Sequence, residues 1–210
     1  MKFDADELAE YMGFIGRDLF TAPLQTTLRQ FEEADNFGSL IRPDVTDVAE
    51  MQTTLEAKDV SGQLFLSETH KKVLLALQQA DYLSPKYHVV IANPPYMGAS
   101  NANSRLKSWL SKNYQEEKND LFAAFIDRNL TLCLAKGSVA MITMQNWMFT
   151  SRYESFRSKL LSRGTILSMA HLGERAFDSI GGEVVSTTAF ILSTQSNQDF
   201  PGIYVWLTQG

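Results

Sequence analysis

The sequence predicts an α/β fold in which a mostly parallel sheet is preceded by a helical segment. Of its 210 residues, 44% are hydrophobic, which is enough for one substantial core. Residues 1–84 carry apolar side chains at helical spacing, whereas residues 85–210 alternate short β-branched runs with amphipathic stretches. An order of strand, helix, strand, helix and strand is typical of parallel strands joined by right-handed helical crossovers. We therefore expect a helical segment over 1–84 and an α/β part over 85–210.

Composition excludes several classes of protein. The single cysteine, Cys133, excludes an intramolecular disulfide and a zinc site built from cysteines, and His70, His88 and His171 lack the spacing of metal ligands. Neither a run of about 18 apolar residues nor a basic and then apolar leader occurs, so we expect a cytoplasmic protein without a membrane span. The net charge is -5, yet residues 1–60 hold 13 acidic and only 5 basic side chains. The later residues are therefore net basic, which weakly favours an anionic partner.

Four helices are expected in the first part. Their apolar residues recur three and four positions apart, and the predicted ranges are Ala5–Leu19, Pro23–Ala34, Thr46–Lys58 and Gln63–Leu83. Between the second and third helices, residues 37–44 hold a glycine and a proline around a short apolar run. This pattern predicts a connection with room for one short strand.

The first strand of the second part is His88–Ala92. Its β-branched and nearly continuous apolar character predicts a strand that is covered on both faces, as in a parallel sheet. The strand ends at Asn93, because Pro94 and Pro95 lack N–H donors and fix their φ angles. The chain must therefore leave the sheet over residues 93–96.

The remaining elements alternate. Helices are expected over Asn103–Tyr114, Asp120–Ala135 and Tyr153–Leu161, and strands over Val139–Met144, Thr165–Ala170, Val184–Leu192 and Ile203–Leu207. The helix over 120–135 would hold Cys133 on its apolar face and end at Lys136-Gly137. Because no helical pattern separates the last two strands, we expect a terminal antiparallel hairpin.

The tetrapeptide Asn93-Pro94-Pro95-Tyr96 carries the chemistry. In open α/β sheets, ligands bind beyond the carboxyl ends of strands, which is where it lies. The Asn93 side-chain carbonyl and the Pro94 backbone carbonyl can accept both hydrogens of a planar amino group, and Tyr96 offers a flat face for stacking. Two such acceptors favour a pyramidal nitrogen, direct its lone pair at an electrophilic methyl group and stabilise the transition state most. No metal or covalent nucleophile is needed, although the same residues could form a simple turn.

These residues resemble those of adenine-N6 DNA methyltransferases, whose signature is Asn/Asp/Ser-Pro-Pro-Tyr/Phe after an apolar strand. Residues 119–125, 137–147, 172–177 and 181–192 match further stretches of that family in the expected order. The resemblance covers about residues 37–193, and residues 34–41 and 92–98 point to the large methyltransferases of BREX-type phage exclusion and restriction-modification. It implies a partial Rossmann-like class I methyltransferase fold, with double-stranded DNA as substrate and S-adenosylmethionine as methyl donor.

The resemblance also implies roles for individual residues. Asn93, Pro94, Pro95 and Tyr96 would be catalytic. Tyr96 and Phe177 would stack on an adenine flipped out of the duplex. Asn93, Asp120 and Phe125 would contact the methyl donor. For two of these residues a structural role stays open, because helical spacing makes Phe125 a core candidate and Asp120 suits the N-terminus of a helix.

One departure from the family pattern concerns the donor site. Related enzymes hold the amino-acid part of the donor with a Gly-rich turn after the first strand and an acidic residue after the second, and neither occurs here. The family order places these elements before Met1 and a target-recognition domain after Gly210. We therefore expect an internal fragment of a larger methyltransferase or the product of a broken reading frame. Its expected partners are the missing N-terminal and C-terminal parts and other phage-defence subunits.

Two further functions remain open. Glutamine methyltransferases that act on translation release factors also use Asn-Pro-Pro-Tyr, since a side-chain amide presents a similar planar amine. The missing Gly-rich turn motivates the other alternative, a catalytically inert segment that supports assembly.

Overall fold

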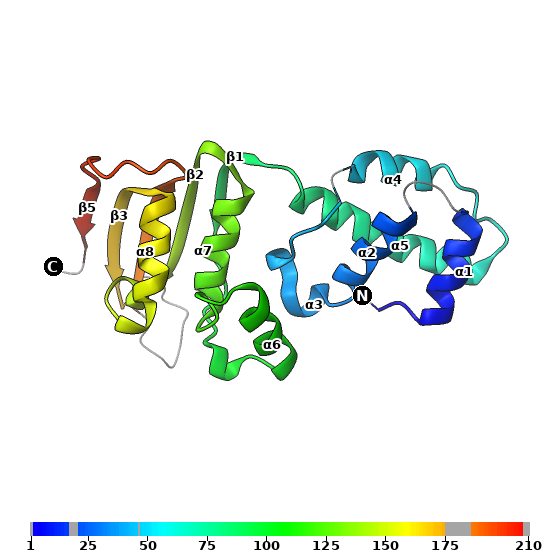
Figure 1. The fold of residues 1–210 in the computed structure, drawn as a ribbon, viewed down its shortest axis with the longest axis horizontal. Helices are drawn as coiled ribbons and strands as arrows, with labels where there is room; N and C mark the ends of the chain where they lie inside the picture. Colours follow the sequence, from blue (N-terminus) through cyan, green and yellow to red (C-terminus); the bar gives the residue numbers. More distant parts are fainter. Residues whose placement is uncertain (1, 17–20, 46, 175–185, 208–210) are drawn as a thin grey trace. The chain divides into compact units, whose positions relative to one another are not determined.

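The structure, a computed structural model, describes residues 2–16, 21–45, 47–174 and 186–207. It divides into two compact units, Met1–Pro85 and Lys86–Gly210 (Figure 1). No helix among the described residues is long and apolar enough to cross a membrane.

The first unit is helical, as predicted. Its helices are α1 (Ala5–Ile15), α2 (Thr21–Phe31), α3 (Ala34–Phe37), α4 (Val48–Glu56) and α5 (Leu64–Leu83). The longest, α5, contacts α1, α2 and α4 and buries Val73, Ala76, Leu77 and Ala80 among them. The short strand allowed within residues 37–44 is absent from these described residues, because Gly38–Leu40 forms a 3₁₀ turn directly after α3.

The ends of α1 follow from local chemistry. The Asp4 carboxylate accepts a hydrogen bond from the Asp6 amide, and the Glu7 carboxylate accepts one from the Asp4 amide, which forms a capping box. The helix ends at Ile15, earlier than the predicted Leu19, because Gly16 adopts a φ of 87° that other residues avoid.

A buried hydrogen bond joins α1 to α5. The Tyr11 hydroxyl lies 2.7 Å from Nδ1 of His70, and both side chains are buried. Burial lowers the pKa of His70, while the charge of Glu56 acts in the opposite direction. Burial also raises the pKa of Tyr11, so the neutral phenol and the neutral imidazole are the favoured pair.

We expect the helical unit to lose stability as the pH falls below about 6.5, the pKa of an unfolded histidine. There the unfolded chain binds a proton that the buried His70 resists, so unfolding becomes easier until the lowered folded pKa is passed. Thermal unfolding followed by circular dichroism at pH 7.5 and 5.5 measures this. The His70→Gln variant should lose the difference, whereas a variant of the exposed histidine, His88→Gln, should keep it. Equal pH dependence in both variants would contradict the account.

The second unit is an α/β structure with a five-stranded sheet, which confirms the predicted fold class. The strands run in the order β1-β2-β4-β3-β5. β1 and β2 are parallel, as are β3 and β5, and only β4 is antiparallel to its neighbours. The bounds are β1 (Tyr87–Ala92), β2 (Cys133–Met144), β3 (Thr165–Gly173), β4 (Thr187–Ser193) and β5 (Ile203–Trp206), with helices α6 (Ser104–Asn113), α7 (Leu121–Leu132) and α8 (Glu154–Arg163).

The predicted terminal hairpin is wrong. β4 lies between β2 and β3, and β5 pairs with the other edge of β3, so the last two strands are not neighbours. Nine residues, 194–202, separate the two strands. Hairpin loops are usually two to five residues long, and this longer connection lets the chain cross to the far edge of β3.

The end of the helix predicted over 120–135 is also wrong. α7 stops at Leu132, and Cys133 begins β2 instead of lying within a helix, although it is buried in the core. Gly137 is not a helix stop, because it lies within β2, where an added Cβ would come 2.9 Å from the carbonyl oxygen of His88. The error arises because the apolar residues over 130–134 fit both helical and strand spacing, so periodicity alone does not locate the end of the helix.

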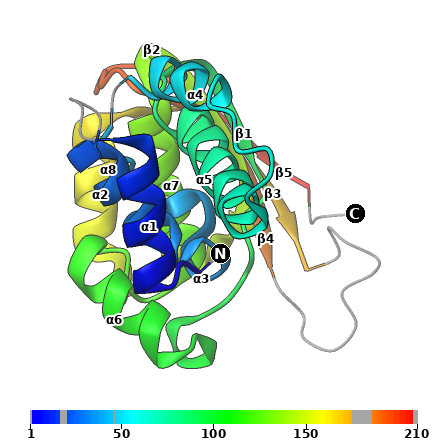
Figure 2. The same cartoon turned by 90° about the vertical axis from the view of Figure 1, so that its right-hand side faces the viewer.

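The core of this unit lies between one face of the sheet and helices α7 and α8, which lie on the same side of the sheet (Figure 2). Along β2, Val139, Met141 and Thr143 are buried, while the intervening residues are only partly covered. The core cluster consists of Phe122, Ala123, Ile126, Leu130, Cys133, Val139, Met141, Trp147, Tyr153, Phe156, Leu160, Phe190 and Leu192.

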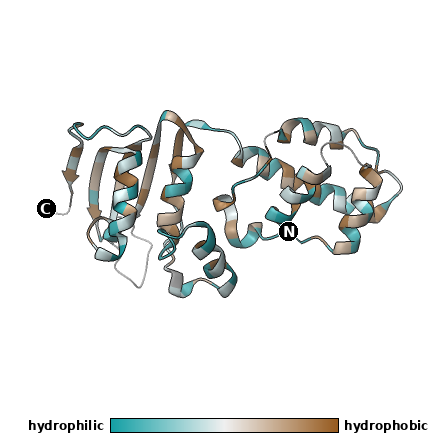
Figure 3. Cartoon of the chain, viewed as in Figure 1, coloured by the Kyte–Doolittle hydropathy of each residue, from teal (hydrophilic) through white to brown (hydrophobic). Residues whose placement is uncertain are grey.

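The opposite face of the sheet is open within this unit. Val89 is 57% exposed and Ile91 is 78% exposed, although Val90 and Ala92 pack against the core. The prediction that this strand is covered on both faces is therefore wrong for the described residues of the unit. The strands are nevertheless largely hydrophobic along their length (Figure 3), which is typical of a sheet that another layer covers.

Candidate active site

The tetrapeptide lies at the carboxyl edge of the sheet, as its sequence predicts. Ala92 is the last residue of β1 and pairs with Met141 of the parallel strand β2, so the loops after both strands leave the sheet at the same edge. Asn93 is exposed at this rim, Pro94 is buried and Tyr96 is partly buried. The buried Pro94 fixes the backbone, while the side-chain amide of Asn93 is accessible to a ligand.

The start of α7 holds the segment after the tetrapeptide in place. The Leu121 amide donates to the Met97 carbonyl at 3.1 Å, and Gly98 forms an antiparallel bridge with Asp120. The Asp120 carboxylate caps α7 by accepting from the Phe122 amide at 3.4 Å. Burial raises the pKa of Asp120, against the opposing effects of this hydrogen bond and of the Arg152 charge. The helix-capping role of Asp120 is thus confirmed, and its contact with the methyl donor stays a prediction.

The loop after β2 reaches the same region. Arg152 donates through Nη2 to the Asn119 carbonyl at 3.5 Å, next to the capping aspartate. The buried Tyr153 ring lies 5.9 Å from that of Phe122, and burial together with the Asp120 charge raises the pKa of Tyr153 to about 12. Three segments separated in sequence, residues 93–98, 117–121 and 145–153, therefore converge beyond the ends of β1 and β2.

Buried polar atoms without hydrogen-bond partners gather at this edge. Among the described residues, they are the hydroxyls of Tyr96 and Tyr153, Oδ1 of Asn146 and Nδ1 of His171. Each such atom costs about 1–3 kcal/mol of stability when it stays unpaired. Tyr96 follows β1, Asn146 and Tyr153 follow β2, and His171 lies near the end of β3. Their concentration at one sheet edge is typical of a site whose ligand supplies the missing partners.

Sequence reasoning singled out Tyr96 but missed Asn146, Tyr153 and His171 as members of this edge. His171 shares a hydrogen bond with the Gln145 side chain through Nε2 and stacks on Trp206, with ring centroids 4.3 Å apart. The only signal in the sequence was that each residue follows or ends a predicted strand.

The two predicted aromatic contacts have different outcomes. Phe125 is partly buried and packs against the core cluster, which accounts for its apolar character without a ligand. Its contact with the methyl donor stays a prediction. Phe177 lies outside the described residues, so its stacking on the target base also stays a prediction.

Asn93 also borders the open face of the sheet. A hollow of about 430 Å³ lies on this face, with Ile91, Ile142 and Ile191 among its apolar walls. The described residues contain no group of three or more His, Cys, Asp or Glu side chains that could hold a metal ion. The candidate site therefore consists of the Asn93 side-chain amide at the rim of the sheet with aromatic and polar side chains beside it, and the hollow lies on the open face of the same sheet.

An open α/β sheet with Asn-Pro-Pro-Tyr at a strand end is typical of methyltransferases that act on planar amines. Comparison with known proteins gives the family. Residues 18–177 match the model of the Eco57I restriction-modification methylases, and the chain belongs to that family.

Curated relatives are much longer than this chain. It is 38% identical over 184 residues to the adenine-specific methyltransferase BrxX of Escherichia coli O9:H4 (strain HS), an alignment that covers 86% of this chain and 15% of BrxX. It is 37% identical over 202 residues to the adenine-specific methyltransferase PglX of Lacticaseibacillus casei (strain Zhang), covering 96% of this chain and 16% of PglX. These relatives confirm the resemblance to large adenine-specific methyltransferases of the BREX type.

Similar solved structures include two restriction-modification enzymes. The Type IIL enzyme MmeI in complex with DNA has 11% identity and a TM-score of 0.49, with 99% of this chain and 38% of that chain covered. The Type ISP enzyme LlaGI, in complex with a DNA substrate mimic, has 15% identity and a TM-score of 0.45, with 75% and 15% covered.

Proposed function

We propose that the protein containing this chain transfers a methyl group from S-adenosylmethionine to the N6 amino group of an adenine flipped out of duplex DNA. The observation that carries the proposal is the tetrapeptide at the carboxyl edge of the sheet, with Asn93 exposed and Pro94 buried. Membership of a restriction-modification methylase family supports methyl transfer. The names of both curated relatives support adenine as the acceptor.

In the proposed mechanism, the Asn93 side-chain carbonyl and the Pro94 backbone carbonyl accept the two N6 hydrogens of the target adenine. These hydrogen bonds turn the nitrogen lone pair toward the reacting carbon and stabilise the positive charge that develops on nitrogen. The Tyr96 ring stacks on the extruded base and recovers part of the cost of leaving the duplex. S-adenosylmethionine supplies an electrophilic methyl group on sulfur. On transfer, the nitrogen lone pair would form the new N–C bond, the sulfur would keep the electron pair of the broken S–C bond, and the positively charged nitrogen would then give one proton to water.

The residues present fit only one side of a donor site. Asn93 at the rim of the sheet could border the donor, but the sequence has no Gly-rich turn to hold the amino-acid part of the donor. The exposure of Val89 and Ile91 favours a further layer over the open face of the sheet, which the described residues of the second unit do not provide. We propose that other parts of the longer polypeptide supply both the turn and the layer. DNA, these polypeptide parts and other phage-defence subunits are thus the proposed partners.

The isolated 210-residue chain, once shown by circular dichroism to be folded, should bind no measurable S-adenosylmethionine in titration calorimetry. The reason is that half of the donor contacts lie elsewhere in the proposed arrangement. The full-length protein serves as the positive control and should bind the donor under the same conditions. Micromolar binding by the isolated chain would show that its own residues complete the donor pocket.

Methyl transfer by the full-length protein tests the function itself. With a donor carrying a labelled methyl group, we expect label in N6-methyladenine when duplex DNA is the acceptor. A translation release factor is the competing acceptor, because a glutamine amide also presents a planar NH₂ to the tetrapeptide. Transfer to the protein alone would replace the DNA function by glutamine methylation, and no transfer to either would favour an inert assembly role.

A further inference from the structure

Phe149 is an exposed aromatic residue at the same sheet edge as the tetrapeptide. It follows the 3₁₀ turn Gln145–Met148 that directly succeeds β2, and 65% of its surface is exposed. Because β1 and β2 are parallel neighbours, the loops that carry Asn93 and Phe149 leave the sheet side by side. An exposed phenylalanine alone needs no functional explanation, so a binding role for Phe149 has to be argued from its surroundings.

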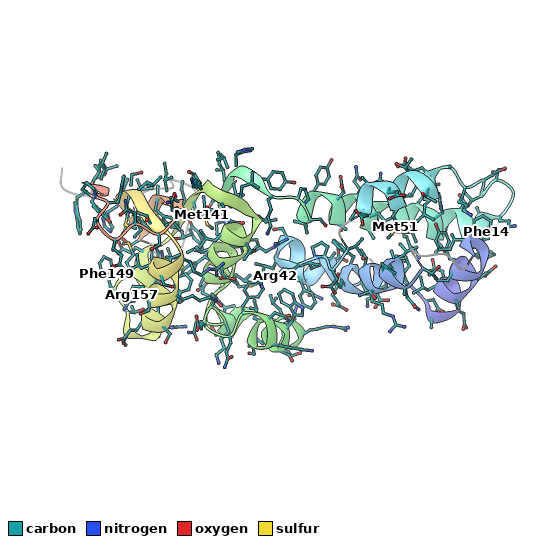
Figure 4. All side chains as sticks on the ribbon, turned by 45° about the horizontal axis from the view of Figure 1, so that its top comes forward. Phe14, Arg42, Met51, Met141, Phe149 and Arg157 are labelled. Carbon is teal, nitrogen blue, oxygen red and sulfur yellow. The ribbon has the colours of Figure 1, made fainter. Side chains whose placement is uncertain are left out.

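The loop that carries Phe149 is held from several directions. Nη1 of Arg157 donates to the Trp147 carbonyl at 2.8 Å and to the Thr150 carbonyl at 2.7 Å, on either side of Phe149. The backbone amides of Phe149 and Thr150 both donate to the Asn146 carbonyl. Figure 4 labels Phe149 and Arg157, which lie close together at one end of the unit. The ring is therefore presented to solvent from a backbone that has little freedom to withdraw it.

The base of this loop is anchored in the core. Trp147 is 2% exposed, and its indole N–H donates to the Thr143 hydroxyl at 3.2 Å. Its ring meets Phe156 and Phe190 in edge-to-face contacts, with centroids 6.0 and 5.4 Å away. A side chain held by such support is preorganised, so little entropy is lost when a ligand meets it.

Two neighbours point to the chemistry of that ligand. Arg152, which is exposed, places a positive charge three positions beyond Phe149. Oδ1 of Asn146, at the base of the same loop, is buried and has no hydrogen-bond partner among the described residues. An exposed aromatic ring and an exposed cation within one loop match a nucleobase and its phosphate.

We propose that Phe149 stacks on a nucleobase of the DNA substrate and so positions it beside the tetrapeptide. This inference rests on the proposed function and adds a contact outside the tetrapeptide. Stacking of a base on an aromatic side chain changes affinity by roughly 5- to 150-fold when the ring is removed. Phe149 would therefore act mainly on DNA binding, whereas Asn93 acts on the chemical step.

The test compares variants of the full-length protein in methyl transfer to duplex DNA, after sequencing of methylated DNA has located the target adenine. Phe149→Ala should raise the KM for DNA by about 5- to 150-fold, whereas Phe149→Trp, which keeps a ring, should have a KM near the original value. Phe200→Ala is the matched control. Phe200 is 42% exposed and lies between β4 and β5, at the end of the strands opposite to the tetrapeptide, so its replacement should leave the KM for DNA unchanged.

Fluorescence of 2-aminopurine placed at the target or at its neighbours identifies the stacked base, because removal of the ring should change the signal at that position only. An unchanged KM and unchanged fluorescence in Phe149→Ala, with an active unaltered protein, would overturn the Phe149 inference alone. An unaltered protein that binds donor but methylates no DNA would overturn the proposed function first. The two failures are therefore distinguishable.

Discussion

Replacement of Asn93 by alanine in the full-length protein should reduce adenine methylation at least about a hundredfold, in line with the loss of one preorganised transition-state hydrogen bond. Asn93 is exposed at the end of β1, so its side chain contributes little to packing. The fold and the DNA affinity should stay nearly unchanged. The measurement is the rate of N6-methyladenine formation at saturating donor and DNA.

Two companion variants separate chemistry from folding. Asn93→Asp keeps an acceptor oxygen and should retain part of the activity. Asn197→Ala removes an exposed asparagine at the opposite edge of the sheet, where Asn197 follows β4, and should leave the rate unaltered. A rate within tenfold of the original for Asn93→Ala, or unfolding of that variant, would refute the assigned role.

Replacement of Trp147 by alanine should strongly destabilise the second unit. Removal of a buried aromatic side chain costs about 3–5 kcal/mol, and this one joins the strand-end loop to Phe156 and Phe190 in the core. We expect faster amide hydrogen exchange in β2 and β4 of the full-length protein, together with loss of methylation, because the loop after β2 would lose its anchor.

The matched controls for Trp147→Ala test packing against hydrogen bonding. Trp147→Phe keeps an aromatic ring but removes the hydrogen bond to the Thr143 hydroxyl and part of the buried indole volume, so it should cost about 1–3 kcal/mol, less than Trp147→Ala. Trp109→Ala affects a half-buried ring on α6 and should leave exchange in β2 nearly unchanged. Unaltered protection of β2 in Trp147→Ala would disprove the anchoring role.

Much of the site was predictable from local chemistry. Pro94 and Pro95 cannot continue a strand, so the end of β1 and the position of Asn93 follow from four residues. The alternation of segments with helical and with strand spacing of apolar residues likewise predicts the α/β class and the order of the elements. Family membership, which the comparison of residues 18–177 establishes, agrees with the resemblance carried by the tetrapeptide and its neighbouring stretches.

The pairing of strands was less predictable, because periodicity assigns a strand without naming its neighbour. The position of β4 between β2 and β3 depends on contacts between residues far apart in sequence, such as Phe190 with Met141 and Met169. Those same pairings bring Asn146, Tyr153 and His171 to the edge that holds Tyr96. A local pattern could identify each residue as lying after a strand but could not show that they share one edge.

The open face of β1 has a different origin. The apolar run of the strand predicts cover on both sides, and the described residues of its unit cover only one. This pattern is consistent with the proposal that a longer polypeptide supplies the second layer, and the chain aligns with only 15% of BrxX and 16% of PglX.

The central claim is that Asn93 and Pro94 receive the amino group of a flipped adenine. A structure of the full-length protein with target DNA and a donor analogue that lacks a transferable methyl group tests it most directly. We predict that the adenine N6 atom lies about 3 Å from both Oδ1 of Asn93 and the Pro94 carbonyl oxygen, within hydrogen-bond distance. An adenine that stays paired in the duplex, or that is held away from these two oxygens, would contradict the claim.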